Sequence, residues 1–458
     1  MIKTKPRFKK IVALAIFLVI ILNNAVFVLA NSPLETLQQR SIDGVIYVPM
    51  RLTAYAHNAT IEWDSLNHAV ILTMANGKIS VISIETAGGF IEDGISWITF
   101  EYAVNLFGIS YEMDIEINYV INNEIDVEIT HETDVLFHVE EVIVGKNAQW
   151  ALDATLTVPV EASLQNPVPG VVLVHGSGPH DRNQEIVPGH ANFYEIASHL
   201  SSNGIAVLRY DKRTFTHGMA MVEELGITAI TVWEETIEDA ILAAEILRTD
   251  TRISEVFMIG HSLGGIMAPR IHAHGGNFDG LIFKAGSPRF LLEISLDQNV
   301  LLIEAMDEGP ERDATVAQME AFAQEIYALS DMSREEVQDV ELAGAGGYYW
   351  WDLLHNPVSN YIISITNIPV LVMQGENDFQ VTVDEDFYAL QQLLVDHNNV
   401  TFILYPGLNH FFMPTTATNI LEAISELTIP STIYHQVLQD IVDWIHSNSA
   451  LEYRVDVT

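Results

Sequence analysis

The stretch Val256–Gly265, VFMIGHSLGG, decides how this chain is interpreted. It begins as an apolar run typical of a buried strand, and the residues after Ser262 (LGGIMAPRIHAH) begin as a helix does. A strand, a tight turn and a helix form the context in which Gly-x-Ser-x-Gly indicates a nucleophilic serine rather than a surface turn. Ser262 is therefore the predicted nucleophile. Gly260 and Gly264 are expected because the crowded turn leaves no room for a Cβ atom.

Short β-branched segments alternate with helical patterns through the rest of this region. Strands that are apolar throughout are buried on both faces, which predicts parallel pairing, and the alternation predicts a doubly wound α/β sheet. One interval, residues 287–355, is helical and strandless, and we expect this insertion to form a cap over the site. The predicted strands are residues 170–176, 204–211, 256–260, 280–286, 368–375 and 400–407, and the predicted helices are residues 191–203, 232–248, 391–396 and 431–446.

An acyl-transfer serine needs a general base, and the base needs an acid that orients it. In this architecture the acid and then the base follow the serine, each in a loop after a late strand. Asp378 and His410 meet both conditions. Glu376 competes for the role of the acid, but the loop reaches further at Asp378. His435 competes for the role of the base, but it lies within a helical pattern.

The oxyanion that forms during acyl transfer needs two backbone N–H donors. Leu263 is predicted to supply one, because it follows the nucleophile at a helix N-terminus whose dipole favours negative charge. The second donor is expected from the glycine-containing loop His175–Asn183, HGSGPHDRN. Ser177 is the preferred residue in this loop and Gly178 is the alternative.

Neither a metal nor a cofactor is predicted. His175 and His180 could suggest zinc, but the sequence has no His-Glu-x-x-His motif and offers no third ligand, so structural roles beside the site are expected. The chain also has no cysteine, which excludes disulfides and thiol catalysis.

Five motifs, in this order, resemble those of the α/β-hydrolase superfamily, in particular exported bacterial carboxylesterases related to the prolyl-oligopeptidase-like and dienelactone-hydrolase-like groups. The resemblance implies an α/β-hydrolase fold, a small-molecule ester substrate, and triad positions for Ser262, Asp378 and His410. Asp211 and Arg213 are expected to organise the loop beside the site, with a plain surface role as the alternative. The motifs are HGSGPHDRN, GIAVLRYDKRT, GHSLGG, QGENDFQV and YPGLNHFF, and the predicted catalytic domain spans residues 138–450.

Two other functions stay open. A serine peptidase or amidase would use the same three residues, although the β-propeller of true prolyl oligopeptidases does not fit in residues 41–130. A non-catalytic cell-surface interaction protein is the alternative of another class, but inert relatives usually lose a triad member and none is lost here.

Residues 1–30 are predicted to be a signal peptide. Five basic residues within residues 3–10 precede the apolar run Ile11–Leu22, and the segment ends in Ala30 at a small-x-small site. An uncleaved membrane anchor is the alternative, because apolar residues resume after Asn24. Either way we expect a secreted or cell-surface protein.

Residues 40–130 contain an internal repeat. Asp43–Ala59 (DGVIYVPMRLTAYAHNA) and Asp93–Ile109 (DGISWITFEYAVNLFGI) align without a gap, and each predicts a turn, a strand and an amphipathic helix. Asn76-Gly77 between them indicates a hairpin turn. The segment resembles the copper amine oxidase N-terminal-like domain, which implies an accessory, non-catalytic role such as cell-wall or surface contact. Copper chemistry is not implied, because His57 and His68 stand alone.

The chain is strongly acidic, with 61 Asp and Glu against 21 Lys and Arg and a formal net charge of −40. Five of the basic residues and none of the acidic ones lie in residues 1–30, so the remainder holds 16 basic against 61 acidic residues, a net charge of −45. Such a surface repels nucleic acid and anionic lipid, so neither is an expected partner. We interpret the charge as an adaptation to a saline or alkaline exterior. The sequence predicts no oligomeric state.

Overall fold

The chain divides into two compact units, one of which covers residues 31–136. The computed structural model describes residues 137–187, 190–342, 345–429 and 431–449 of the other unit, and residue 136 and the backbone of seven strands between residues 40 and 99 of the first. The predicted signal peptide lies outside the described residues.

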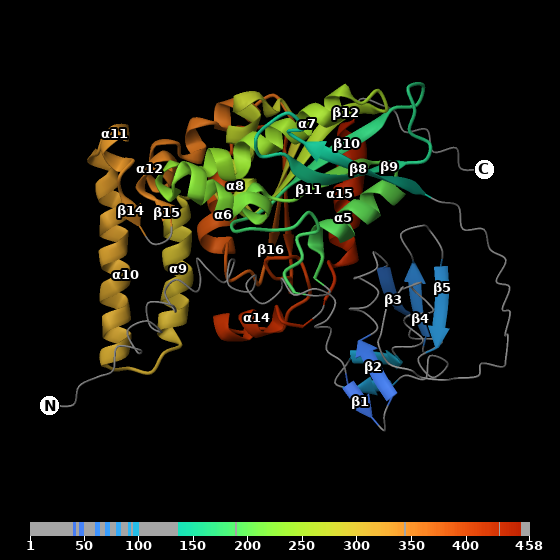
Figure 1. The fold of residues 1–458 in the computed structure, drawn as a ribbon, viewed down its shortest axis with the longest axis horizontal. Coiled ribbons are helices and arrows are strands. Elements are labelled where there is room, and N and C mark those ends of the chain that lie inside the picture. Colours follow the sequence, from blue (N-terminus) through green and yellow to red (C-terminus); the bar gives the residue numbers. More distant parts are fainter. Residues whose placement is uncertain are drawn as a thin grey trace. The chain divides into compact units, whose positions relative to one another are not determined.

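The larger unit is built on an eight-stranded sheet in the order β17-β16-β13-β12-β10-β11-β9-β8 (Figure 1). All six predicted strands are present and pair in parallel, which confirms the mostly parallel sheet. Two further strands, β8 and β9, extend it by antiparallel pairing, and β8 is the edge strand. The bounds are β8 (Phe137–Val144), β9 (Leu152–Pro159), β10 (Val168–Val174), β11 (Ala206–Tyr210), β12 (Ile253–His261), β13 (Gly280–Lys284), β16 (Val370–Gly375) and β17 (Val400–Tyr405).

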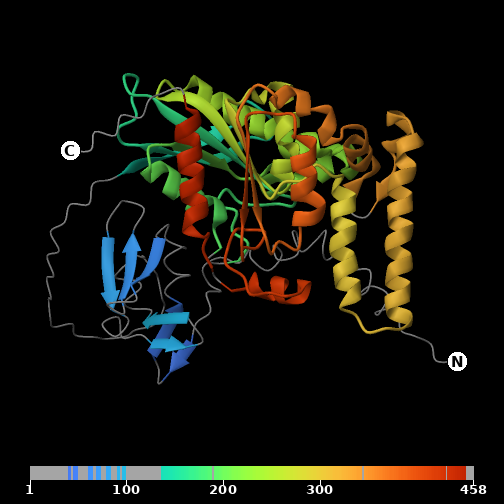
Figure 2. The same ribbon diagram turned by 180° about the vertical axis from the view of Figure 1, so that it is seen from behind.

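Helices cover both faces of this sheet. Residues of β10 alternate between two apolar clusters, because successive side chains of a strand point to opposite faces. Helices α5 and α15 pack on one face, and α7, α8 and α13 pack on the other; α8 lies in front of the sheet in Figure 1 and α15 in Figure 2. The bounds are α5 (Asn192–Ser202), α6 (Arg213–Leu225), α7 (Glu238–Thr249), α8 (Leu263–Ile271), α13 (Tyr388–Leu393), α14 (Ile420–Glu426) and α15 (His435–Asn448).

The insertion at residues 287–355 is mainly helical, as predicted, but it is not strandless. Two strands of two residues each, β14 and β15, pair in a small antiparallel hairpin. The helices α9 and α10 lie side by side in both views (Figures 1 and 2). The bounds are α9 (Leu291–Glu304), α10 (Pro310–Ala328), α11 (Arg334–Val337), β14 (Glu341–Leu342), β15 (Ala345–Gly346) and α12 (Gly347–His355).

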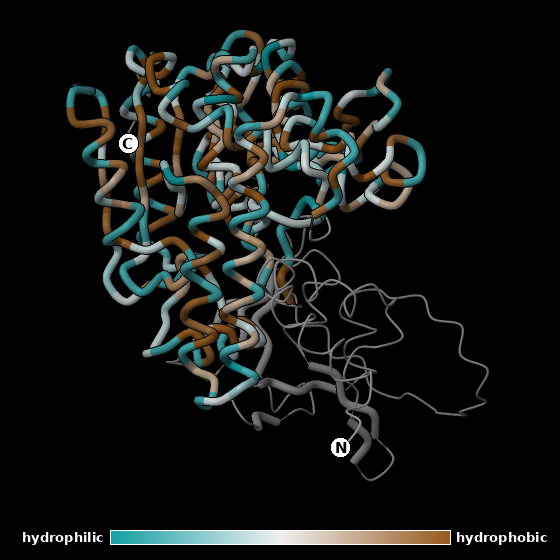
Figure 3. Tube along the Cα trace, turned by 90° about the vertical axis from the view of Figure 1, so that its left-hand side faces the viewer, coloured by the Kyte–Doolittle hydropathy of each residue, from teal (hydrophilic) through white to brown (hydrophobic). Residues whose placement is uncertain are grey.

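Along the tube, hydrophobic and hydrophilic residues are interleaved, including within the helices (Figure 3). Among the described residues, no helix combines the length and the apolar character that a membrane span requires.

The smaller unit contains two antiparallel sheets, β1-β2-β7-β6 and β3-β4-β5. Strands β2 and β7 occupy equivalent positions of the two repeat copies and pair with each other, which joins the copies. The strand just before each copy, β1 or β6, forms a hairpin with it. The helices predicted in each copy lie outside the described residues. The strands are β1 (Arg40–Ile42), β2 (Val45–Pro49), β3 (Thr60–Asp64), β4 (Ala69–Thr73), β5 (Ile79–Ser83), β6 (Phe90–Glu92) and β7 (Ile95–Thr99).

Candidate active site

Ser262 lies in a strained turn between β12 and α8. Its backbone angles are φ 53° and ψ −116°, a conformation that non-glycine residues rarely adopt. The crowding expected around it is present. A Cβ atom on Gly260 would come within 2.3 Å of the Gly264 carbonyl oxygen, and one on Gly264 would come within 2.3 Å of the Val174 carbonyl oxygen. The turn therefore brings β12 and α8 close to β10 and holds the serine at their junction.

His410 and Asp378 are bonded to each other in the loops after β17 and β16. The Nδ1–H of His410 donates to Oδ2 of Asp378 at 2.7 Å. Both residues are buried, at 4% and 5% exposed respectively. This bond leaves the Nε2 atom of the neutral imidazole as an acceptor, which is the state a general base requires.

The competing residues lie elsewhere. Glu376 is exposed, two residues before the buried Asp378. His435 begins α15 on the surface, where its ring contacts His199 and not the pocket. Of the candidate acids and bases, the structure therefore brings together Asp378 and His410.

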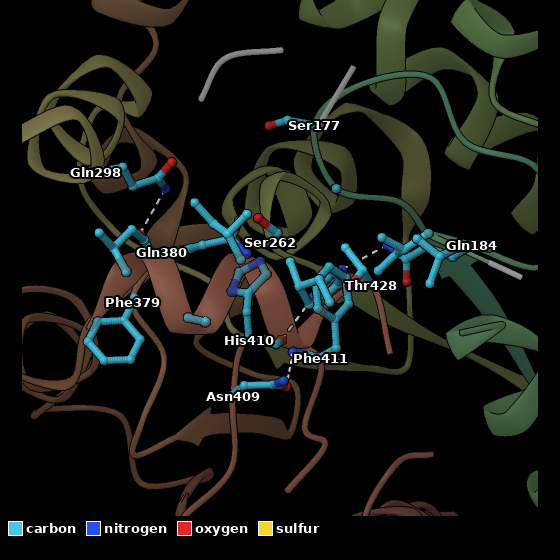
Figure 4. A pocket seen from close by; sticks show the side chains of 18 of the residues that line it. Ser177, Gln184, Ser262, Gln298, Phe379, Gln380, Asn409, His410, Phe411 and Thr428 are labelled. Atoms are coloured by element: carbon cyan, nitrogen blue, oxygen red, sulfur yellow. Dashed lines mark hydrogen bonds between the residues drawn. The ribbon is translucent and has the colours of Figure 1, made fainter. Parts of the chain in front are cut away.

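Ser262 and His410 line one pocket, a cavity of about 150 Å³ (Figure 4). Gly176 and Ser177 border it from the loop after β10. Half of the other sixteen lining residues are apolar. Four of these apolar residues lie on α14 or directly after it, whereas the predicted cap contributes only the polar Gln298 to the described lining. The apolar lining residues are Ile186, Val187, Phe379, Phe411, Ile420, Ala423, Ile424 and Leu427.

The backbone N–H groups of Leu263 and Ser177 have no acceptor within the described part of the chain. Leu263 is the first residue of α8, where an N–H group has no partner in its own helix. The fallback residue, Gly178, has φ 87° and does not border the pocket. Two backbone N–H donors without a protein acceptor in the described residues therefore lie beside Ser262, one at the start of α8 and one in the loop after β10.

The two loop histidines bond to backbone carbonyls, as expected for structural roles. His175 donates through Nε2 to the Asp181 carbonyl oxygen, and His180 donates through Nε2 to the Ser177 carbonyl oxygen at 2.8 Å. Burial, aided by the charge of Lys212, lowers the pKa of His180 to about 4. Burial also holds the pKa of His175 well below its usual range. Both rings are thus neutral donors at neutral pH.

Of the two residues of the motif RYDKRT that were expected to organise this loop, Asp211 does so and Arg213 does not. Asp211 accepts from the backbone N–H and the guanidinium of Arg182, so it does anchor the loop. Arg213 instead pairs with Asp239 on α7. Lys212, which sequence reasoning passed over, donates to the Gly176 carbonyl oxygen at 2.7 Å. Its place between a buried strand and a helix could have pointed to Lys212, but its partner cannot be identified from the sequence because it is 36 residues away.

A metal site is not evident in the described ranges, since no group of three or more His, Asp or Glu side chains there could hold an ion.

The chain is similar to known hydrolases in sequence. The family described as serine aminopeptidase S33 matches residues 165–299. Esterase EstD of Thermotoga maritima is 31% identical over 317 residues, which cover 69% of this chain and 68% of that protein. The chain belongs to the α/β-hydrolase family of this esterase.

Two solved structures have a similar fold. Est1E from Butyrivibrio proteoclasticus is 15% identical with a TM-score of 0.43, and it matches over 67% of this α/β-hydrolase chain and 98% of its own. A thermostable carboxyl esterase from Bacillus coagulans is 18% identical with a TM-score of 0.41, over 68% and 98% of the two chains.

Proposed function

We propose that this α/β-hydrolase is a carboxylesterase that works through Ser262, His410 and Asp378. The observation that supports it most is the bond between His410 and Asp378 at the pocket that Ser262 also lines. The apolar lining favours the acyl part of an uncharged ester, and the esterase named among the relatives has the same activity class. The substrate is therefore a small-molecule carboxylic ester.

In the proposed mechanism, Ser262 attacks the ester carbonyl carbon as His410 Nε2 takes its hydroxyl proton. Asp378 holds the imidazole in the required tautomer and stabilises its positive charge. The backbone N–H groups of Leu263 and Ser177 donate to the oxyanion of the tetrahedral intermediate. His410 then protonates the departing alcohol, and a water molecule, activated in the same way, hydrolyses the acyl-enzyme.

Hydrolysis of p-nitrophenyl acetate, butyrate and octanoate by the wild type and by Ser262→Ala tests the proposal. We expect turnover in the wild type and a loss of several orders of magnitude in the variant. Ser177→Ala is the matched control, because it removes a serine hydroxyl from the same pocket but keeps the backbone donor. It should retain activity and labelling by a fluorophosphonate probe. Equal labelling of Ser262→Ala and wild type would contradict the assignment.

A serine aminopeptidase or amidase is the second candidate, since the matching family carries that description. The same residues would then cleave an amide bond. A p-nitroanilide with the acyl group of the best ester separates the two, because an esterase should cleave it far more slowly. Absence of turnover on every ester and anilide, with the protein folded, would instead favour a non-catalytic surface protein.

Export is a further part of the proposal, with residues 1–30 as a cleaved signal peptide and residues 40–130 as an accessory domain that contacts the cell wall or surface. It is supported by the basic residues before the apolar run that ends in Ala30. Expression of the full chain in a bacterium should release a protein whose N-terminal residue is Asn31. An intact N-terminus in the membrane fraction would indicate an anchor instead.

A further inference from the structure

Lys212 is a buried cation that the proposed mechanism leaves unused. It lies between β11 and α6, and its side chain is 2% exposed. Its Nζ donates to the Gly176 carbonyl oxygen at 2.7 Å and to a carboxylate oxygen of Glu235 at 2.6 Å. Burying an ammonium group is costly even when it is paired. A buried cation on a carbonyl at the edge of the catalytic pocket therefore requires a functional explanation.

The geometry of a peptide bond supplies one. The Gly176 carbonyl and the Ser177 N–H belong to the same planar trans peptide, so they point in opposite directions. Gly176 and Ser177 border the pocket, whereas Lys212 and Glu235 do not. A bond from Lys212 to the Gly176 oxygen thus turns the Ser177 N–H away from the buried ion pair. Within the described residues, no protein acceptor takes that N–H.

The loop needs such a restraint because it has a glycine on each side of Ser177. Gly178 has φ 87°, and Gly176 has no side chain to limit its rotation. The next carbonyl along, that of Ser177, is held by His180 at 2.8 Å. The two consecutive peptide planes are therefore each fixed by a buried side chain.

We propose that Lys212 is a positioning residue that fixes the 176–177 peptide so that the Ser177 N–H faces the oxyanion. This inference rests on the proposed function. The positive charge has a second effect, since a charge-assisted bond to the carbonyl polarises the peptide and strengthens its N–H as a donor. Lys212 touches no reacting atom and acts through the backbone of Gly176.

The same ion pair connects this peptide to the insertion. Glu235 also accepts from the hydroxyl of Tyr349 at 2.7 Å, and Tyr349 lies on α12. Three hydrogen bonds in series thus connect the insertion to the loop that carries Gly176 and Ser177. Removing the hydroxyl with Tyr349→Phe should lower kcat less than any change at Lys212, because the Lys212 bond to Gly176 remains.

The test uses the full chain and compares Lys212→Met with Arg213→Met on p-nitrophenyl butyrate. Arg213 is the matched control, because it is the adjacent buried cation and pairs with Asp239 without touching residues 175–178. We expect Lys212→Met to lower kcat about 100-fold, as loss of an oxyanion donor does, with KM changed less than about 3-fold. The affinity of a trifluoromethyl ketone, which forms a tetrahedral adduct, should fall by a similar factor. Arg213→Met should keep the wild-type kcat and inhibitor affinity per folded molecule.

Equal losses in Lys212→Met and Arg213→Met, or an unchanged kcat and inhibitor affinity in folded Lys212→Met, would overturn the inference. If Lys212→Met does not fold, Lys212→Met combined with Glu235→Gln removes both charges of the pair and leaves neither of them unpaired, and the same results are expected of it. Ser262→Ala separates the two levels of proposal. If Ser262→Ala is inactive while Lys212→Met is fully active, the inference alone fails. If Ser262→Ala is fully active, the proposed function fails.

Discussion

Asp378 receives four donors on its two carboxylate oxygens. Gln374 and His410 donate to Oδ2, and the backbone N–H groups of Gln380 and Val381 donate to Oδ1. Asp378→Asn would place an amide where His410 donates and would favour the wrong imidazole tautomer. We expect kcat to fall by about 10⁴-fold, with the fold retained. Steady-state kinetics check this against Glu376→Gln, which changes the exposed carboxylate two residues earlier and should leave kcat within about 2-fold.

His180 gives the stability of the protein a specific dependence on pH. Burial lowers its pKa from 6.5 to about 4, so as the pH falls the unfolded chain takes up this proton before the folded protein does. The stabilisation is complete above pH 6.5 and is lost between pH 6.5 and 4, by about 3 kcal/mol in the free energy of unfolding. Urea unfolding at pH 7, 6 and 5 should show that the free energy of unfolding decreases less with falling pH in His180→Gln than in the wild type. Parallel curves for the two proteins would contradict the prediction.

At the scale of elements, we expect α14 to limit how long an acyl chain the pocket accepts. Ala423 and Ile424 on this helix line the pocket, whereas Leu421 on the same helix is 52% exposed. Ala423→Phe should lower kcat/KM for p-nitrophenyl octanoate at least about 10-fold and leave acetate nearly unchanged, because the larger side chain occupies volume that only the long chain needs. Leu421→Phe places the same side chain on the exposed face of this helix, outside the pocket, and should change neither value. Equal effects of Ala423→Phe on both esters would exclude an acyl site beneath α14.

The same elements show what could be predicted from the sequence. A strand such as β10 is predictable because burial on both faces makes every residue apolar, and the turn at Ser262 is predictable because its glycines have a local steric cause. Helix α14 was missed because seven residues give too short a period to identify an amphipathic helix. Lys212 was missed because its partners are 23 and 36 residues away, and only the folded chain brings them together.

At the scale of the whole molecule, the acidic excess leaves few cations for many carboxylates. In the larger unit, Arg182, Arg252 and Arg289 each contact at least two carboxylates. Salt would weaken these pairs, but the three arginine side chains are between 18% and 28% exposed, and partly buried pairs are screened less than exposed charges. Each such pair contributes about 1 kcal/mol or less, whereas a net charge of −40 acts between all parts of the surface.

Repulsion should therefore dominate, and Tm should rise as salt is added. Between 0.01 and 1 M the screening length falls from about 30 Å to about 3 Å, so most of the rise is expected at low concentration, with a plateau once the length is shorter than the spacing of surface charges. NaCl and KCl should act equally, because screening depends on ionic strength. Sucrose, which is excluded from the surface without screening charge, should give a rise without a plateau. A Tm that stays constant or falls in NaCl would show that the ion pairs outweigh the repulsion, and the acidic surface would then need another explanation than adaptation to a saline exterior.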